Sequence, residues 1–204
     1  LEQKPKAVFL FTVCLHHFLG SDLERIYDEL GKRFPEICFV RCFMDPIMRK
    51  SGLTPDQKLR LSMYDPLKKG TVTEEGQRRI SILGSDFALD ETSDLKRLLR
   101  CNDYQIKESP VCESWEDYLS LSDCRMMLNC YPSGKAGTEW AAERLGRPFM
   151  YLPSCFGYDE IIGQLEALSE SMELLGVLDY EGEKESCEAS LHEALLEVGD
   201  WPIA

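Results

Sequence analysis

Long apolar runs and histidines are both scarce in this sequence. No stretch approaches the ~18 apolar residues of a membrane-spanning helix, and the opening Leu-Glu-Gln-Lys-Pro lacks the layout of a secretory signal. We therefore expect neither a membrane span nor secretion. The chain of 204 residues has three histidines. We predict that the adjacent His16 and His17 lie in a loop, and a histidine-based catalytic triad is not indicated.

Motifs of common nucleotide, hydrolase and zinc sites are absent. The sequence contains no G-x-G-x-x-G, P-loop, H-E-x-x-H, G-x-S-x-G or C-x-x-C. Cys38 and Cys42 are four residues apart on a predicted strand, which separates them by about 13 Å at ~3.3 Å per residue. Because Zn–S bonds are about 2.3 Å long, these two thiols cannot share one zinc ion. We interpret both as core residues.

Positive charge is in the minority, with 23 basic against 36 acidic residues and a net charge of −13. A protein that binds a phosphate backbone needs a basic face, so we expect no nucleic-acid partner. Residues 179–204 carry more than half of this excess, with eight acids against Lys184 alone. We interpret this acidic segment as a solvated helix face at a domain junction; docking to a basic partner surface is the alternative.

Cysteine, in contrast, is abundant. The chain has nine cysteines, and an odd count without a secretory signal does not fit an extracellular disulfide framework. We therefore expect a reducing cytoplasm, in which free thiols either pack as small apolar side chains or bind metal.

The period of the apolar pattern predicts a βαβ unit at the start of the chain. Residues 7–13 form an apolar run typical of a strand buried on both faces. A capping box at Ser21-x-x-Glu24 predicts a helix that ends before Pro35, and residues 37–43 predict a second strand. A short helix is expected over 55–64, after a loop over 44–56. Such units build parallel sheets with right-handed crossovers.

The pattern restarts after a turn-rich segment at 65–77. We predict further strands at 79–83, 104–107, 125–130 and 148–152, and helices at 92–100, 114–121, 133–145, 161–175 and 181–197. The fold class is therefore α/β, with Rossmann-like parallel sheets flanked by helices and two units in series. The expected domains are a partial first unit over 1–70, a second over 71–178, and an acidic helical tail over 179–204. Because the sequence lacks an initiator Met, we expect it to be a segment of a longer chain, with residues 199–204 leading to a third domain.

Four cysteines follow predicted strands directly or closely: Cys14, Cys112, Cys130 and Cys155. Ligands of open parallel sheets bind outside the carboxyl ends of the strands, so these thiols could reach a bound metal cluster. Helices that begin after Cys14 and Cys130 would lower the pKa of each thiol and favour the thiolate. The alternative is that small side chains pack at crowded strand–helix corners.

Several segments together resemble a known family. Residues 12–24, Thr-Val-Cys-Leu-His-His-Phe-Leu-Gly-Ser-Asp-Leu-Glu, resemble the nitrogenase component 1 segment T-C-x-x-x-[LVI]-I-G-D-D-[IL]-E. Val40-Arg41-Cys42 also fits. Residues 80–86, 128–133, 148–152 and 156–157 are similar, in this order, to the strand and turn segments of the second domain of that family.

The resemblance implies an oxidoreductase subunit built of Rossmann-like domains that hold iron–sulfur clusters. It implies that Cys14 ligates an interface iron–sulfur cluster and that Cys130 anchors a catalytic cofactor. Because the further cluster ligands of the family lie outside this segment, we do not expect the segment by itself to retain the cluster. The implied partners are an ATP-dependent iron protein that delivers electrons and a homologous or identical subunit. A strictly anaerobic organism is the expected setting.

Departures from the family pattern leave other functions open. Val13 separates Thr12 from Cys14, and the glutamine and histidine beside the family's cofactor would fall near Lys50 and Thr54. Nitrogen reduction itself is therefore not expected, and the substrate is an unspecified small molecule. The alternatives are a non-catalytic scaffold for metallocofactor assembly, and a small-molecule-binding α/β module in which both thiols only pack.

Overall fold

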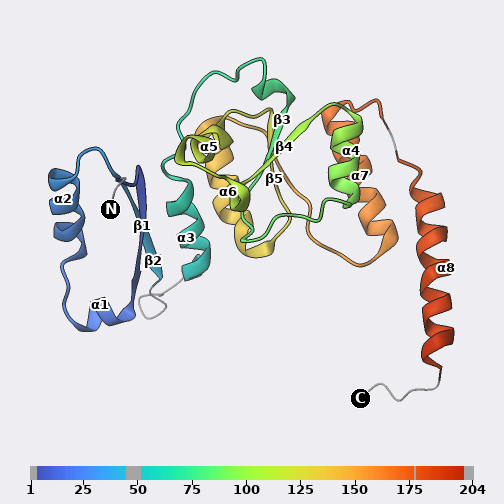
Figure 1. Cartoon of the computed structure of the whole chain (residues 1–204), viewed down its shortest axis with the longest axis horizontal. Helices are drawn as coiled ribbons and strands as arrows, with labels where there is room; N and C mark the ends of the chain where they lie inside the picture. Colours follow the sequence, from blue (N-terminus) through green and yellow to red (C-terminus); the bar gives the residue numbers. More distant parts are fainter. Residues whose placement is uncertain (1–3, 45–51, 177, 200–204) are drawn as a thin grey trace. The chain divides into compact units, whose positions relative to one another are not determined.

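A computed structural model describes residues 4–44, 52–176 and 178–199 of the chain. The first apolar run forms β1 (Ala7–Val13), which pairs in parallel with β2 (Cys38–Met44), with Ala7 opposite Cys38. The connecting helix α2 (Leu23–Arg33) buries Tyr27, whose hydroxyl donates a hydrogen bond to the Leu10 carbonyl at 3.1 Å. The predicted βαβ unit is confirmed (Figure 1).

Two local predictions in this unit are wrong. Asp22, not Ser21, caps α2, because its carboxylate accepts a hydrogen bond from the Arg25 amide at 3.1 Å. His16 and His17 lie in a short helix, α1 (Cys14–Phe18), instead of a loop. The ring nitrogen Nδ1 of His16 lies 3.2 Å from the amide nitrogen of Val13 and 3.1 Å from its carbonyl oxygen, which closes this turn onto the end of β1.

The second sheet has four parallel strands in the order β4-β3-β5-β6. Its strands are β3 (Arg79–Ile82), β4 (Gln105–Glu108), β5 (Met126–Asn129) and β6 (Phe149–Tyr151). The remaining helices are α3 (Pro55–Tyr64), α4 (Asp94–Cys101), α5 (Trp115–Leu119), α6 (Pro132–Leu145), α7 (Tyr158–Met172) and α8 (Tyr180–Val198). Single-turn 3-10 helices lie at Gly76–Arg78, Ser109–Val111 and Ser120–Ser122. Parallel sheets flanked by helices confirm the predicted α/β class.

The chain forms two compact units. One contains residues 1–90 and 103–154, and the other contains 91–102 and 155–204. The first unit therefore holds both sheets, and the second holds α4, α7 and α8. No helix among the described residues is both long and apolar enough to cross a bilayer. Residues 45–51, which include Lys50, lie outside the described residues, as do residues 200–204 of the segment predicted to lead to a third domain.

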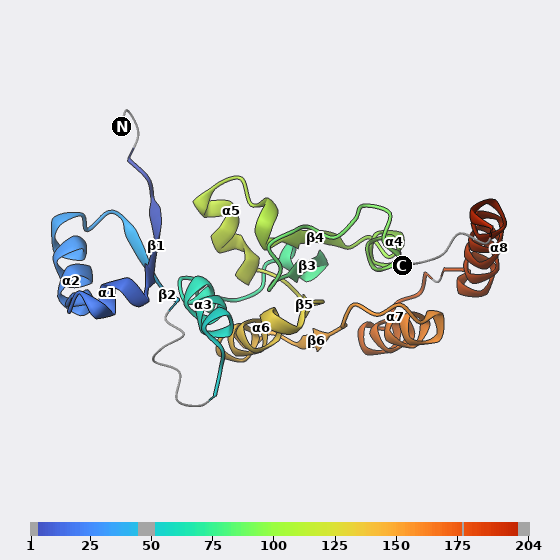
Figure 2. The same ribbon diagram turned by 90° about the horizontal axis from the view of Figure 1, so that it is seen from below.

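The core of the first unit lies between one face of the four-stranded sheet and helices α3, α5 and α6. Its fully buried members include Tyr64, Leu83, Leu121, Met127 and Leu145. Figure 2 shows α3 beside α6, and their packing is close because a Cβ on Gly137 would lie only 2.5 Å from the Cβ of Arg60. The absence of a side chain at Gly137 thus lets α3 approach α6 closely.

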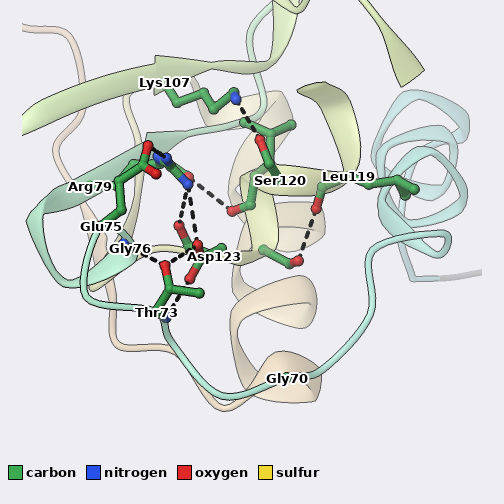
Figure 3. A network of polar contacts seen from close by, with 12 residues as sticks. Gly70, Thr73, Glu75, Gly76, Arg79, Lys107, Leu119, Ser120 and Asp123 are labelled. Carbon is green, nitrogen blue, oxygen red and sulfur yellow. Dashed lines mark hydrogen bonds and ion pairs between the residues drawn. The ribbon is translucent and has the colours of Figure 1, made fainter. Parts of the chain in front are cut away.

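A polar network ties the segment before β3 to the turn before β5 (Figure 3). The carboxylate of Asp123 accepts hydrogen bonds from the Thr73 amide at 2.9 Å and the Thr73 hydroxyl at 2.6 Å. Arg79 donates to the Asp123 carbonyl at 3.1 Å and pairs with Glu75. Burial of Asp123 acts to raise its pKa, but the bonds from Thr73 and the charge of Arg79 keep that pKa below its ordinary value. The network fixes where the second sheet begins.

Candidate functional site

The strand order of the second sheet marks a point where its direction of winding reverses. From β3 the chain adds β4 on one side, and then β5 and β6 on the other. Ligands of open α/β sheets bind outside the carboxyl ends of the strands at such a switch point. The residues that follow β3 and β5, from Leu83 and Cys130 onward, are therefore the structural candidates for a site. We call the carboxyl ends of these two strands the switch-point edge.

Two glycines let the backbone close at the switch-point edge. Gly84 follows β3 with a φ of +90°, and a Cβ on it would lie 2.8 Å from the Cα of Gly134 in the first turn of α6. A Cβ on Gly134 would lie 2.3 Å from the Cα of Gly84. The Gly84 amide also donates a hydrogen bond to the buried Tyr64 hydroxyl at 2.6 Å. Neither glycine position has room for a side chain.

Cys130 follows β5 directly and is 6% exposed. Burial, together with the negative charge of Glu108, raises the pKa of its thiol to about 11. The predicted lowering of this pKa by the start of α6 is therefore wrong: loss of solvation outweighs the field of the helix terminus. At neutral pH this side chain is a thiol.

Glu108, the last residue of β4, is a member of this site that the sequence analysis did not identify. Glu108 lies opposite Ile82 in the sheet register, and Ile82 lies opposite Leu128. Cys130 follows Leu128 by two residues and thus shares its face of the sheet. Glu108 is 5% exposed, and its carboxylate accepts a hydrogen bond from the Leu89 amide at 2.7 Å. A buried acid and a buried thiol therefore lie on one face of the switch-point edge.

Asn129 lies on the opposite face and is fully buried. Its side-chain nitrogen donates a hydrogen bond to the Leu83 carbonyl at 2.8 Å, which joins the ends of β3 and β5, while its Oδ1 has no hydrogen-bond partner among the described residues. The predicted strand over 125–130 included Asn129, but nothing in the sequence pattern distinguished it from its apolar neighbours.

A buried arginine supports the loop that follows β3. Arg60 of α3 donates two hydrogen bonds to the Asp86 carboxylate, at 2.8 and 2.7 Å. The side chain of Arg60 is 6% exposed and that of Asp86 is 65% exposed. The hydrogen bonds from Arg60 lower the pKa of Asp86. This bidentate pair fixes the loop two residues beyond Gly84.

Cys14 occupies the corresponding position in the other sheet, as the first residue of α1 after β1. Its side chain is half-buried. The apolar side chains around it in sequence are 45% to 71% exposed, namely Phe11, Val13, Leu15, Phe18 and Leu19. We call these five residues with Cys14 the Cys14 surface. The thiol thus lies among exposed apolar residues and is not enclosed in the core.

The remaining thiols are distributed over core and surface. Cys42 is fully buried, as predicted, whereas Cys38 is half-buried beside the same small cluster. Cys112 and Cys155 are half-buried; Cys155 accepts a hydrogen bond from the side chain of Gln164 at 3.2 Å. Cys14 directly follows β1 of the first sheet, and Cys130 directly follows β5 of the second. Within residues 4–44, 52–176 and 178–199, no three His, Cys, Asp or Glu side chains form a group that could hold a metal ion.

Two cavities of the first unit lie away from both predicted site residues. One cavity, of about 340 Å³, lies alongside β2 and is lined by Val40, Arg41 and Trp140, among others. A second of about 630 Å³ lies between β1 and α5, where Phe9, Trp115 and Tyr118 form an aromatic cluster. Neither of these two is lined by Cys14 or Cys130.

No protein-family model and no curated protein matches this sequence. The structure is similar to one described as nitrogenase Cp1 at pH 6.5, with a TM-score of 0.68 and 16% identity over 93% of this chain and 46% of that chain. It is also similar to nitrogenase Cp1 at pH 5, with a TM-score of 0.56 and 14% identity over 82% of this chain and 34% of that one. The fold is therefore nitrogenase-like, and the chain spans less than half the length of these neighbours.

Proposed function

We propose that this chain is part of a nitrogenase component 1-like oxidoreductase subunit. In this role Cys14 is one ligand of an iron–sulfur cluster, which passes electrons from an ATP-dependent iron protein to a small-molecule substrate. The similarity of fold to the nitrogenase structures supports this assignment, as does the resemblance of residues 12–24 to the cluster-binding segment of the family. As part of the same proposal, residues 1–70 belong to a first Rossmann-like domain, residues 71–178 form a second, and residues 179–204 form an acidic helical tail.

The position of Cys14 is the observation that carries this proposal. A half-buried thiol at the carboxyl end of a parallel strand, among exposed apolar side chains, suits a cluster that must be shielded from water once a partner covers it. Cysteine thiolates are the usual ligands of iron–sulfur clusters, and the burial of a cluster sets its reduction potential. The Cys14 surface therefore has the chemistry of a site completed by another subunit.

The fit to a complete cluster is partial. Cys14 supplies one soft ligand, whereas the described residues bring no group of three ligands together. Further cysteines must therefore come from outside these residues, and a homologous or identical subunit on the Cys14 surface is the proposed source. When bound, the cluster would supply one-electron transfer; this chain's part is to hold one thiolate and to exclude water.

Cys130 is proposed as the anchor of a second cofactor at the switch-point edge. A thiol must lose its proton to bind a metal, and burial together with Glu108 opposes this loss in the free chain. The positive charge of a metal centre would offset that cost. Glu108 then limits how much negative charge the cofactor itself can carry.

Iron and acid-labile sulfide in the anaerobically purified protein test the proposal. We expect both to copurify with the full-length wild type, and Cys14→Ala in the full-length protein to lose at least half of the iron. Cys187→Ala is the matched control, because Cys187 is an exposed thiol on α8 that follows no strand; its iron content should equal that of the wild type. Equal iron in both variants would contradict the role of Cys14.

A scaffold for metallocofactor assembly is the second candidate. One observation favours it: with no group of three ligands among the described residues, a cofactor would be shared with a partner and could be released. In a scaffold, iron should leave within minutes of adding an acceptor protein or a chelator. The cluster signal in the electron paramagnetic resonance spectrum of the dithionite-reduced protein should then disappear as the iron leaves. The scaffold should also show no substrate turnover.

A further inference from the structure

Helix α8 carries an apolar stripe along one side. With about 100° between successive residues of an α-helix, five of its residues fall within a sector of about 100°: Cys187, Leu191, Ala194, Leu195 and Val198. Their spacing of four, three, one and three residues is that of a helix that packs against an apolar surface. Leu196 lies on the other side of the helix.

This stripe is uncovered in the described part of the chain. Leu191 is 56% exposed, Leu195 is 58% exposed and Val198 is 49% exposed, and no residue of α8 is buried. Surface apolar residues are common singly, but a continuous stripe on a two-turn length of helix marks a contact face. We therefore expect a partner surface to cover the apolar stripe.

The same side of α8 already makes contacts at its amino-terminal end. Glu183 pairs with Arg97 of α4, one oxygen lying 2.7 Å from the guanidinium, and Lys184 pairs with Asp159 of α7 at 3.1 Å. On the helical wheel Glu183 borders the sector of the stripe, and Lys184 and Tyr180 lie within it. Tyr180 is half-buried. The uncovered stripe thus continues a face that the second unit uses for its own packing.

Charge on α8 limits what can cover the stripe. The helix has six glutamates and one lysine, a net charge of −5, and Glu188 and Glu197 border the stripe on its two sides. A second copy of the helix would bring like charges together, and helices that bind membranes carry basic polar faces. Nucleic acid is excluded by the same sign of charge. The surface that best complements the stripe and its glutamate borders is an apolar groove with basic residues along its edges.

We propose that α8 docks its apolar stripe into an apolar groove of another protein, with lysine or arginine residues along both edges of that groove. Amphipathic helices bind grooves in this way through anchors spaced three and four residues apart, such as i, i+3, i+4 and i+7, and the stripe of α8 has the same spacings. Leu191 and Leu195 are the apolar anchors here. Glu188 and Glu197 set the orientation and the salt dependence.

A synthetic 18-residue helical peptide with leucine on one face and lysine along both borders provides the probe. Its binding to the whole chain is followed by fluorescence anisotropy at 50 mM and 500 mM NaCl. We expect measurable binding at low salt that weakens at high salt, and at least tenfold weaker binding for the double variant Leu191→Gln, Leu195→Gln. Because both leucines are exposed, this variant should fold as the wild type does, which circular dichroism can verify.

Two matched variants separate this docking from general attraction between opposite charges. Leu196→Gln, on the other side of α8, should bind within twofold of the wild type. Glu188→Lys with Glu197→Lys should weaken binding at least tenfold, whereas Glu185→Lys with Glu193→Lys, which changes the net charge equally on the far side, should weaken it less than threefold. Equal losses in the two charge variants, no binding below 1 mM, or self-association through α8 would each overturn the proposal.

Discussion

At the scale of single residues, the switch-point edge combines groups whose roles depend on neighbours far away in sequence. The Cys130 thiol keeps its proton because it is buried and because Glu108 lies on the same face of the sheet. Gly84 and Gly134 are required because the backbone of one occupies the space of a side chain on the other. Each of these effects depends on two residues that are close in space but distant in sequence, and no local sequence motif predicts it.

Replacement of Gly84 by alanine should destabilise the protein by about 2–4 kcal/mol. The new Cβ would lie 2.8 Å from the Gly134 backbone and 2.1 Å from the Asn129 side chain, at a φ of +90°, and both the clash and the backbone strain cost free energy of unfolding. Gly163→Ala is the control, because apart from its chain neighbours and the backbone of α7 no atom of the described residues lies within 4 Å of its Cβ position. Urea unfolding should show that the control gains about 0.5–1 kcal/mol.

The Arg60–Asp86 pair should make stability depend on acid pH. Hydrogen bonds from Arg60 lower the pKa of Asp86 from its usual value of about 3.9. Because the folded state has the lower pKa, the stabilisation is complete above about pH 4 and is lost as pH falls through the folded value. Asp86→Asn should cost about 1–2 kcal/mol at pH 7, since Asp86 is partly solvated, and should flatten the stability curve below pH 4.

The exposed Arg25–Glu29 pair on α2 provides the comparison for that measurement. Its side chains are 74% and 63% exposed, and they are 2.9 Å apart. Glu29→Gln should change the free energy of unfolding by less than about 0.5 kcal/mol, since exposed ion pairs contribute little. An equal effect of the two substitutions would mean that burial of Arg60 adds nothing to its pair.

At the scale of elements, the sequence was sufficient wherever the apolar period was regular. The helix predicted over 55–64 is α3 (Pro55–Tyr64), and the predicted strands coincide with β1 to β6 to within about two residues at either end. Local sequence signals gave the wrong helix cap where two adjacent residues, Ser21 and Asp22, are both favoured at the N-cap position. They also failed at α1, whose single turn is closed by His16 against Val13.

The cap of α2 offers a direct test of that failure. Asp22→Ala should lower the stability of the protein by about 1 kcal/mol, because the Arg25 amide loses its acceptor at the helix start. Ser21→Ala should change it by less than about 0.3 kcal/mol. Thermal unfolding followed by far-ultraviolet circular dichroism measures both. A larger loss for the serine variant would show that Ser21, as first predicted, caps this helix.

At the scale of the whole molecule, the pattern of residues was enough for the class of fold but not for the composition of the site. Alternation and turn residues determine parallel strands and helices locally, so the α/β class follows from them. The pairing of Glu108 with Cys130 depends instead on the register of three strands, β4, β3 and β5. The Arg60–Asp86 pair likewise depends on where α3 packs, which no local spacing contains.

Folding of this chain should not require metal, because its core is closed by apolar side chains such as Tyr64, Leu83 and Met127. After treatment with EDTA and an iron chelator, we expect a single cooperative unfolding transition for the first unit. In the full-length protein with its partner subunit, added iron and sulfide that bind only the folded state should then raise the unfolding temperature. At ligand concentrations about 100-fold above Kd the gain is about 2.7 kcal/mol, or roughly 5–10 °C for a chain of this length.

Cys14→Ala separates this gain from stability of the fold itself. Since Cys14 is half-buried on the surface, the metal-free variant should unfold within about 2 °C of the metal-free wild type. Added iron and sulfide should raise the unfolding temperature of the variant by less than half of the wild-type gain, because one ligand of the proposed cluster is missing while the site proposed at Cys130 remains. A metal-free wild type without a cooperative transition would instead place the metal inside the folding core, as in small zinc domains, and would contradict a cluster held at the surface around Cys14.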